Sequence, residues 1–301
     1  MRVGRTGALA PQPEGPAPAP VIQRLRVRYA KRGRMRFTSH RDISRAVERA
    51  VRRAGIPVAF SAGFTPHPKI SYTGAAATGV ASEAEYLELG LTETRDPARV
   101  RGDLDAALPA GLDVLDVVEA RPPARAGEAQ AARPAALADR LEASLWQVRL
   151  DGVDAEAAAR AVDAFVAADR IEVERLTKKG RRRFDVRAAV SACELDRRAS
   201  AAADAPCAIL RMVVRHTTPA VRPDDILAGL RQVADLAPPS PPLVTRLAQG
   251  PVDAGTGELA DPLDPDRETV APSGDDAAAG HGPARTQSAE PASVDAVSAR
   301  P

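Results

Sequence analysis

Residues 24–55 of the chain read RLRVRYAKRGRMRFTSHRDISRAVERAVRRAG, and this stretch holds the two patterns that decide the fold. First, Leu25, Val27 and Tyr29 alternate with arginines, which is the period-two pattern of a β-strand with a charged outer face. Second, the apolar residues after the histidine recur at the spacing of a single helical face. The sequence therefore predicts a strand followed by an amphipathic helix over residues 40–54.

The segments that follow predict further strands and helices in a recurring order. In the first part of the chain we expect strands at 57–61, 86–91 and 112–118 and a helix at 98–108. In the second part we expect strands at 145–150, 171–176, 184–190, 207–214 and 244–247 and helices at 155–168 and 224–230. Apart from one extra strand in the second part, both follow the β-α-β-β-α-β order of the ferredoxin-like fold. The predicted fold class is α+β, with two tandem ferredoxin-like domains.

Composition sets the expected domain boundaries. Residues 251–301 contain seven Asp, three Glu and only three Arg, so their net charge is −7, and they contain no aromatic residue. Such a segment cannot bury enough apolar surface to offset the entropy of ordering it. We therefore expect a Pro-rich disordered tail at 1–21, a first domain at 22–120, an Ala/Pro-rich linker at 121–143, a second domain at 144–250 and an acidic disordered tail at 251–301.

Length and residue usage exclude several classes of protein. A chain of 301 residues has room for about two domains. Its two cysteines are too few for a disulfide scaffold or for an iron–sulfur cluster held by this chain alone. The sequence contains no long apolar run and no apolar signal-peptide core, so we expect a soluble cytoplasmic protein with no membrane contact. Cys193 and Cys207 are 14 positions apart with no nearby histidine at the spacing of a metal site, so no metal ligand is assigned.

Positive charge is the strongest functional signal. Residues 24–53 contain twelve Arg or Lys and two acidic residues, a net charge of +10, and basic surfaces of this density attract nucleic acid. A second basic run, RLTKKGRRR at 175–183, is expected at the tip of a hairpin that reaches for phosphates. The alternatives are a solvated helix face with internal pairs such as Glu48–Arg52, and a solubilising turn. The predicted RNA-binding residues are Arg41, Arg45, Arg49, Arg52, Arg53, Lys69, Lys178, Lys179, Arg181, Arg182 and Arg183.

The loop FSAGFTPHPKISY, residues 60–72, combines rigid positions with functional side chains. Its shape is expected to depend on Gly63, Phe64, Pro66 and Pro68. Metal-independent RNA cleavage needs an acid, a base and a cation, so the weak candidates for catalysis are His40, His67 and Lys69. Nothing in the sequence places the two histidines together, and a lone histidine is more often a structural hydrogen bonder.

Residues 36–89 resemble a bacterial family of unknown function, of actinobacterial type, whose members are linked to radical-SAM proteins. The motifs that carry the resemblance are Ser39-His40-x-Asp42, Arg52-Arg53-Ala54-Gly55, Ser61-x-Gly63-Phe64-x-Pro66-His67-Pro68-Lys69 and Gly79-x-x-Ser82-x-x-Glu85. The resemblance implies a radical-SAM partner protein, sometimes fused, and a gene setting close to ribosomal and RNA-processing genes. It places the iron–sulfur cluster and S-adenosylmethionine on that partner and no cofactor on this chain.

Three functions are consistent with these features. The leading hypothesis is an accessory module that binds ribosomal or transfer RNA and presents it to an RNA-modification or RNA-processing partner. The second is a metal-independent enzyme that cleaves or modifies RNA, although the sequence establishes no catalytic constellation. The third is an interaction scaffold for a radical-SAM enzyme, in which the basic helix meets an acidic protein surface.

Overall fold

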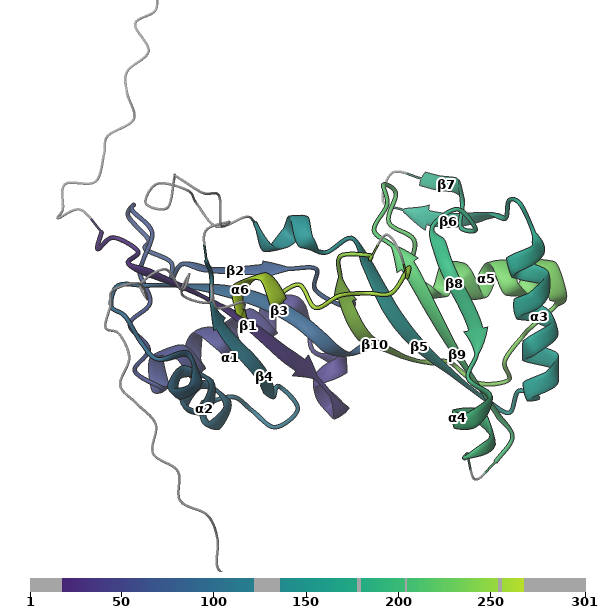
Figure 1. Cartoon of the computed structure of the whole chain (residues 1–301), viewed down its shortest axis with the longest axis horizontal. Helices are drawn as coiled ribbons and strands as arrows, with labels where there is room; N and C mark the ends of the chain where they lie inside the picture. The colour runs from purple at the N-terminus through teal and green to yellow at the C-terminus, as the bar shows by residue number, and fades with distance from the viewer. Residues whose placement is uncertain (1–17, 122–135, 178–179, 204, 254–255, 268–301) are drawn as a thin grey trace, which may run out of the picture. The chain divides into compact units, whose positions relative to one another are not determined.

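The computed structural model describes residues 18–121, 136–177, 180–203, 205–253 and 256–267 (Figure 1). In the first half the elements are β1 (Gln23–Lys31), η1 (Gly33–Phe37), α1 (His40–Arg53), β2 (Ile70–Thr73), β3 (Ala81–Leu91), α2 (Pro97–Ala107) and β4 (Val114–Glu119). In the second half they are η2 (Leu137–Arg140), β5 (Ala143–Asp151), α3 (Ala155–Ala167), β6 (Glu172–Thr177), β7 (Gly180–Asp185), β8 (Val190–Leu195), α4 (Arg197–Ala201), β9 (Cys207–Arg215), α5 (Pro223–Ala234), β10 (Leu243–Gly250) and α6 (Asp264–Arg267).

One mixed sheet of eight strands runs through both halves of the described chain. Its order is β4-β1-β3-β10-β5-β9-β8, and β2 pairs with β3 beside this path. The halves join where Thr245 and Arg246 of β10 pair in parallel with Ala81 and Ser82 of β3. Because of this shared sheet, the expected pair of separate ferredoxin-like domains is not confirmed, whereas the mixture of helices and a multi-stranded sheet is.

Most predicted elements form within a few residues of their expected bounds, and two do not. The strand expected at 57–61 is reduced to isolated bridges from Val58 to Leu91 and from Phe60 to Pro68, and the regular strand β2 begins later, at Ile70. The strand expected at 184–190 is divided, because β7 ends at Asp185 and β8 begins at Val190. Apolar residues alone did not show where these strands break.

The two larger apolar clusters of the described chain lie one in each half. In the first half, Leu25, Val27 and Tyr29 of β1 pack with the apolar faces of α1 and α2, as the alternation in β1 predicts. In the second half, the cluster includes Phe165 of α3 and Ile226 of α5, which pack against β5, β8 and β9. In Figure 1, α1 and α2 lie on one side of β1, β3 and β4, and α6 lies on the other.

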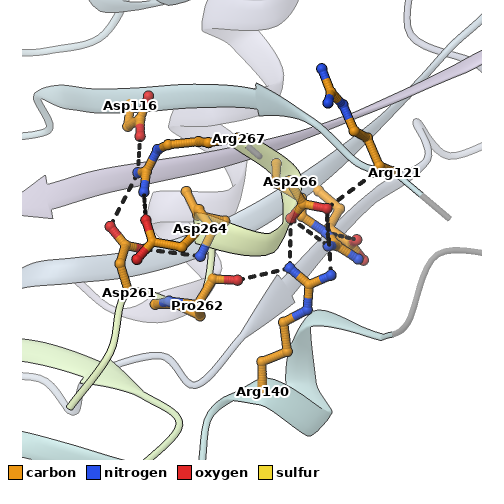
Figure 2. Close-up of polar contacts among 11 residues, drawn as sticks. Asp116, Arg121, Arg140, Asp261, Pro262, Asp264, Asp266 and Arg267 are labelled. Carbon is orange, nitrogen blue, oxygen red and sulfur yellow. Dashed lines mark hydrogen bonds and ion pairs between the residues drawn. The ribbon is translucent and has the colours of Figure 1, made fainter. Parts of the chain in front are cut away.

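The predicted charged outer face of β1 is wrong at its centre. The Arg26 side chain is fully buried, because residues 256–267, here called the C-terminal strap, cover that face of the sheet. Figure 2 shows the Asp266 carboxylate of the strap beside Arg140 and Arg121. It lies 2.6 Å from Arg140 Nη1 and 2.6 Å from Nη1 of the buried Arg26. The Arg121 amide also donates to Asp266 Oδ1 at 3.1 Å.

The strap and η2 lie in the segments that were expected to be a tail and a linker. Leu263 of the strap is fully buried in a cluster with Tyr86, Leu137 and Leu141. Burial of one leucine side chain stabilises a fold by about 1.5–3 kcal/mol. Residues 137–143 of the expected linker and residues 256–267 of the expected tail therefore belong to the folded body, and the rest of both segments lies largely outside the described residues.

None of the helices that the structure describes is long and apolar enough to cross a lipid bilayer.

Candidate nucleic-acid interface

Helix α1 forms where the sequence predicts it, and its start is fixed by side chains. Ser39 is the N-cap, and its Oγ accepts from the Asp42 amide at 3.2 Å and donates to the Asp42 carboxylate at 2.7 Å. The residues that point into the core are Ile43, Ala46, Val47, Ala50 and Val51. Burial of this face leaves the opposite face of α1 in solvent.

The exposed face of α1 carries all five arginines predicted for it: Arg41, Arg45, Arg49, Arg52 and Arg53. Of these five, only Arg45 has an ion-pair partner among the described residues, the Asp42 carboxylate at 3.5 Å. The Glu48–Arg52 pair, which would have neutralised part of this face, is not among the ion pairs of the described chain. Four guanidinium groups are thus available to an external anion.

Four other basic residues of the run at 24–53 have partners within the molecule: Arg26, Arg28, Lys31 and Arg32. Lys31 is fully buried, and its Nζ donates to the carbonyl oxygens of Ala76 and Ala77 at 3.1 and 2.9 Å. Arg28 lies 3.7 Å from Asp261 of the strap, and Arg32 pairs with Glu83 and with Asp113. The strong positive surface is therefore narrower than the net charge of the segment suggests, and α1 is its main part.

The loop after α1 holds its tip away from the body. The Ser61 amide donates to the His67 carbonyl at 2.8 Å, and the His67 amide donates to Ser61 Oγ at 3.0 Å, which closes the loop at its base. Between them, Gly63 has a φ of +126°, a conformation that side-chain-bearing residues rarely adopt, and Phe64 is 80% exposed. The structural role expected for Gly63 fits this geometry.

The three weak catalytic candidates are not brought into contact. The His40 ring meets the edge of the Tyr72 ring, with centroids 5.1 Å apart, and Tyr72 Oη donates to the Ser44 carbonyl at 3.5 Å. His67 and Lys69 are exposed on the loop and share no hydrogen bond with His40 in the described chain. Burial raises the pKa of Tyr72 to about 12, so its hydroxyl stays protonated.

The hairpin of β6 and β7 carries the second basic run, but its charge is partly neutralised. Arg181 pairs with Glu174 at 2.9 Å, and Arg183 lies 3.4 Å from Glu172, both across the two strands. The net charge of residues 175–183 does not include Glu172 and Glu174, because both precede this segment in β6. Arg182 is exposed on the same hairpin, and the predicted Lys178 and Lys179 lie outside the described residues.

A buried ionic cluster lies where β1, β3 and β10 meet, and the sequence did not indicate it. The Arg246 guanidinium donates to the carboxylate of Glu85 and, at 3.3 Å, to Ser82 Oγ. Glu85 also accepts from the Ala76 amide at 3.1 Å, so the cluster fixes the loop at 74–80. Burial lowers the pKa of Lys31. Only the fold brings Arg246 to Glu85, because 161 positions separate them.

The cysteines have the surroundings of core residues. Cys193 and Cys207 are buried and reduced, and burial raises the pKa of the Cys193 thiol to about 12. No group of three or more potential metal ligands is found in the part of the chain that the structure describes. Two thiols are also too few for a cluster that needs about four.

Comparison with protein-family models identifies the family. The model described as "Uncharacterized protein conserved in bacteria (DUF2344)" matches residues 24–223, about two thirds of the chain. The chain belongs to the DUF2344 family. The match takes in α1, the loop at 60–69 and the β6–β7 hairpin of this DUF2344 protein, and it ends before β10 and the strap. A search of curated proteins finds none that matches the chain.

Proposed function

We propose that this DUF2344 protein is an RNA-binding accessory module, and that α1 is its main contact with the phosphate backbone. One observation carries the proposal: α1 presents Arg41, Arg49, Arg52 and Arg53 to solvent, and none of them has an ion-pair partner in the described chain. A helix of 14 residues is about 21 Å long, so these groups can meet several phosphates of one strand. Arginine is suited to this role because its planar guanidinium donates to phosphate in two parallel hydrogen bonds.

The RNA would be ribosomal or transfer RNA, and the partner a radical-SAM protein that carries the iron–sulfur cluster and S-adenosylmethionine. Both statements rest on the resemblance of residues 36–89. They agree with a cysteine content too low for this chain to hold a cluster itself. We place the protein in the cytoplasm, where such RNA and such a partner occur.

We also infer that each half is a ferredoxin-like unit within the shared sheet. In the first half the strands lie in the order β4-β1-β3-β2, the fourth, first, third and second in sequence. In the second half the order β10-β5-β9-β8 is the same, if the β6–β7 hairpin and α4 are counted as insertions. On this basis 22–120 and 144–250 remain the two structural units of the chain.

The test is RNA affinity across a salt series for the full chain and two matched triple variants. Replacing Arg49, Arg52 and Arg53 by Gln is expected to weaken binding and to lower the slope of log K against log salt by about 0.7–0.9 for each phosphate that the variant no longer neutralises. The control replaces three exposed helical arginines of the second half, Arg160, Arg198 and Arg231, by Gln.

Both variants lose three positive charges, so the comparison separates a specific surface from net charge. Equal weakening in the two variants would contradict a role for α1. Unchanged RNA affinity in the α1 variant, with loss of a co-purifying protein, would favour the scaffold hypothesis instead.

A further inference from the structure

Three phenylalanine side chains are exposed, and all three lie on the first half of the molecule. Phe37 is 60% exposed, Phe60 is 48% exposed and Phe64 is 80% exposed. The two other phenylalanines of the chain, Phe165 and Phe184, are buried in the core. Only 3% of the residues are aromatic, and three of the five phenylalanines are exposed.

The exposed rings stand at both ends of the arginine face of α1 along the chain. Phe37 precedes the N-cap Ser39, and the Arg36 guanidinium lies over its ring, 4.6 Å from the centroid. Phe60 follows the end of α1 by seven residues and bridges to Pro68 at the base of the loop. The rings are thus part of the same continuous segment as the unpaired arginines.

Phe64 is held out by the loop itself. The mutual hydrogen bonds of Ser61 and His67 close the loop, and Pro66 restricts the backbone between them. Phe64 makes no aromatic or cation–π contact in the described chain, and its neighbours Gly63 and Thr65 are exposed as well. A ring presented in this way offers both faces to a ligand.

The chemistry around the rings favours a nucleic acid over a protein surface. Cationic side chains lie before and after the rings of the loop along the chain, among them Arg53 before Phe60 and Lys69 after Phe64. Helix α1 carries two acidic residues, Asp42, which pairs with Arg45, and Glu48. Aromatic side chains spaced along a basic surface are the arrangement by which proteins bind single strands, since each ring can stack on one unpaired base.

We propose that the α1 surface selects unpaired RNA, with bases stacked on Phe37, Phe60 and Phe64. The inference rests on the proposed function, because the arginines supply the phosphate contacts. The rings then determine which form of RNA is bound. An A-form duplex hides the faces of its bases inside the stack, so it can satisfy the arginines but not the rings. The ligand class is therefore a single-stranded segment such as a loop, a bulge or a chain end.

The test compares one RNA oligonucleotide, single-stranded and annealed to its complement, by fluorescence anisotropy with the full chain. We expect tighter binding of the single strand. We expect Phe64→Ala and Phe37→Ala each to weaken that binding by about five-fold or more and to leave duplex affinity unchanged. Phe64→Tyr should bind like the wild type because it keeps the ring, whereas Phe64→Leu should bind like Phe64→Ala.

The control is Val166→Ala, which shortens an exposed apolar side chain on α3 and should change neither affinity. Equal wild-type affinity for single strand and duplex, or an unaltered preference in the Phe variants, would overturn the stacking inference. In that case weakening by the Arg49, Arg52 and Arg53 substitutions would still support the proposed function. Absence of binding to both RNAs at low salt would instead overturn the proposed function itself.

Discussion

At the scale of single residues, burial decides what a titratable side chain can do. Cys193 lies on β8 with only 9% of its surface exposed, and burial raises the pKa of its thiol from 9.0 to about 12. In the unfolded chain the same thiol loses its proton near its ordinary pKa. Such a thiol is a poor nucleophile at neutral pH, so it acts as an apolar core group.

This shift predicts how stability depends on pH. Between pH 9 and 12 the folded chain keeps the Cys193 proton and the unfolded chain does not, so the free energy of unfolding falls as pH rises, by at most about 1.4 kcal/mol per pH unit. Urea unfolding at pH 8, 9 and 10 measures this slope. Cys193→Val should reduce it by removing the group, and an identical slope in that variant would show that Cys193 does not contribute.

The sequence predicts which arginines of α1 are exposed, but it does not predict which arginine of β1 is buried. The exposure of Arg41, Arg45, Arg49, Arg52 and Arg53 follows from the spacing of the apolar residues on the same helix. The burial of Arg26 could not be foreseen, because its covering group, Asp266, is 240 positions away. A period-two pattern shows that the two faces of a strand differ in polarity. It does not show whether another segment of the chain covers the polar face.

At the scale of elements, the β6–β7 hairpin shows why charge counted along the sequence misleads. Register places Glu172 opposite Asp185 and Glu174 opposite Arg183, and the ion pairs run diagonally, from Glu172 to Arg183 and from Glu174 to Arg181. Exposed pairs of this kind contribute little to stability, about 0–1 kcal/mol. Their main effect is to reduce the positive electrostatic potential of the hairpin, which an anion would meet.

Removing these acids is therefore expected to strengthen RNA binding. The double variant Glu172→Gln and Glu174→Gln frees Arg181 and Arg183 and removes two negative charges, so affinity at low salt should rise several-fold if the hairpin approaches phosphates. A binding titration measures this change. Glu156→Gln, which breaks the exposed pair with Arg197 elsewhere in the same half, is the control. A similar rise in both variants would point to a general charge effect.

At the scale of the whole molecule, the strap is tied to the first half of the sheet by one buried carboxylate. The Asp266 side chain is fully buried between Arg26 and Arg140, whereas Asp264 on the same short helix is 57% exposed and pairs with Arg267 (Figure 2). Breaking a buried ion pair leaves an uncompensated charge in the interior. The two aspartates therefore differ in burial but share an element and a charge.

Asp266→Asn is expected to lower the free energy of unfolding by about 3–5 kcal/mol, and Asp264→Asn by less than about 1 kcal/mol. Urea denaturation of the full chain followed by circular dichroism measures both. Comparable losses in the two variants would mean that the strap adds no specific stability. A loss confined to Asp266→Asn would show that this buried carboxylate stabilises the folded body.

The sequence by itself determined α1, its apolar and basic faces and the order of most strands, because these depend on neighbours within about four residues. It also determined family membership, since the family model matches residues 24–223. Only the tertiary structure decided which arginine and lysine side chains form ion pairs within the molecule. It paired Arg26 with Asp266 and Arg246 with Glu85 across more than half of the chain, and it joined both halves in one sheet. Such contacts depend on how distant segments pack, and no local pattern encodes that.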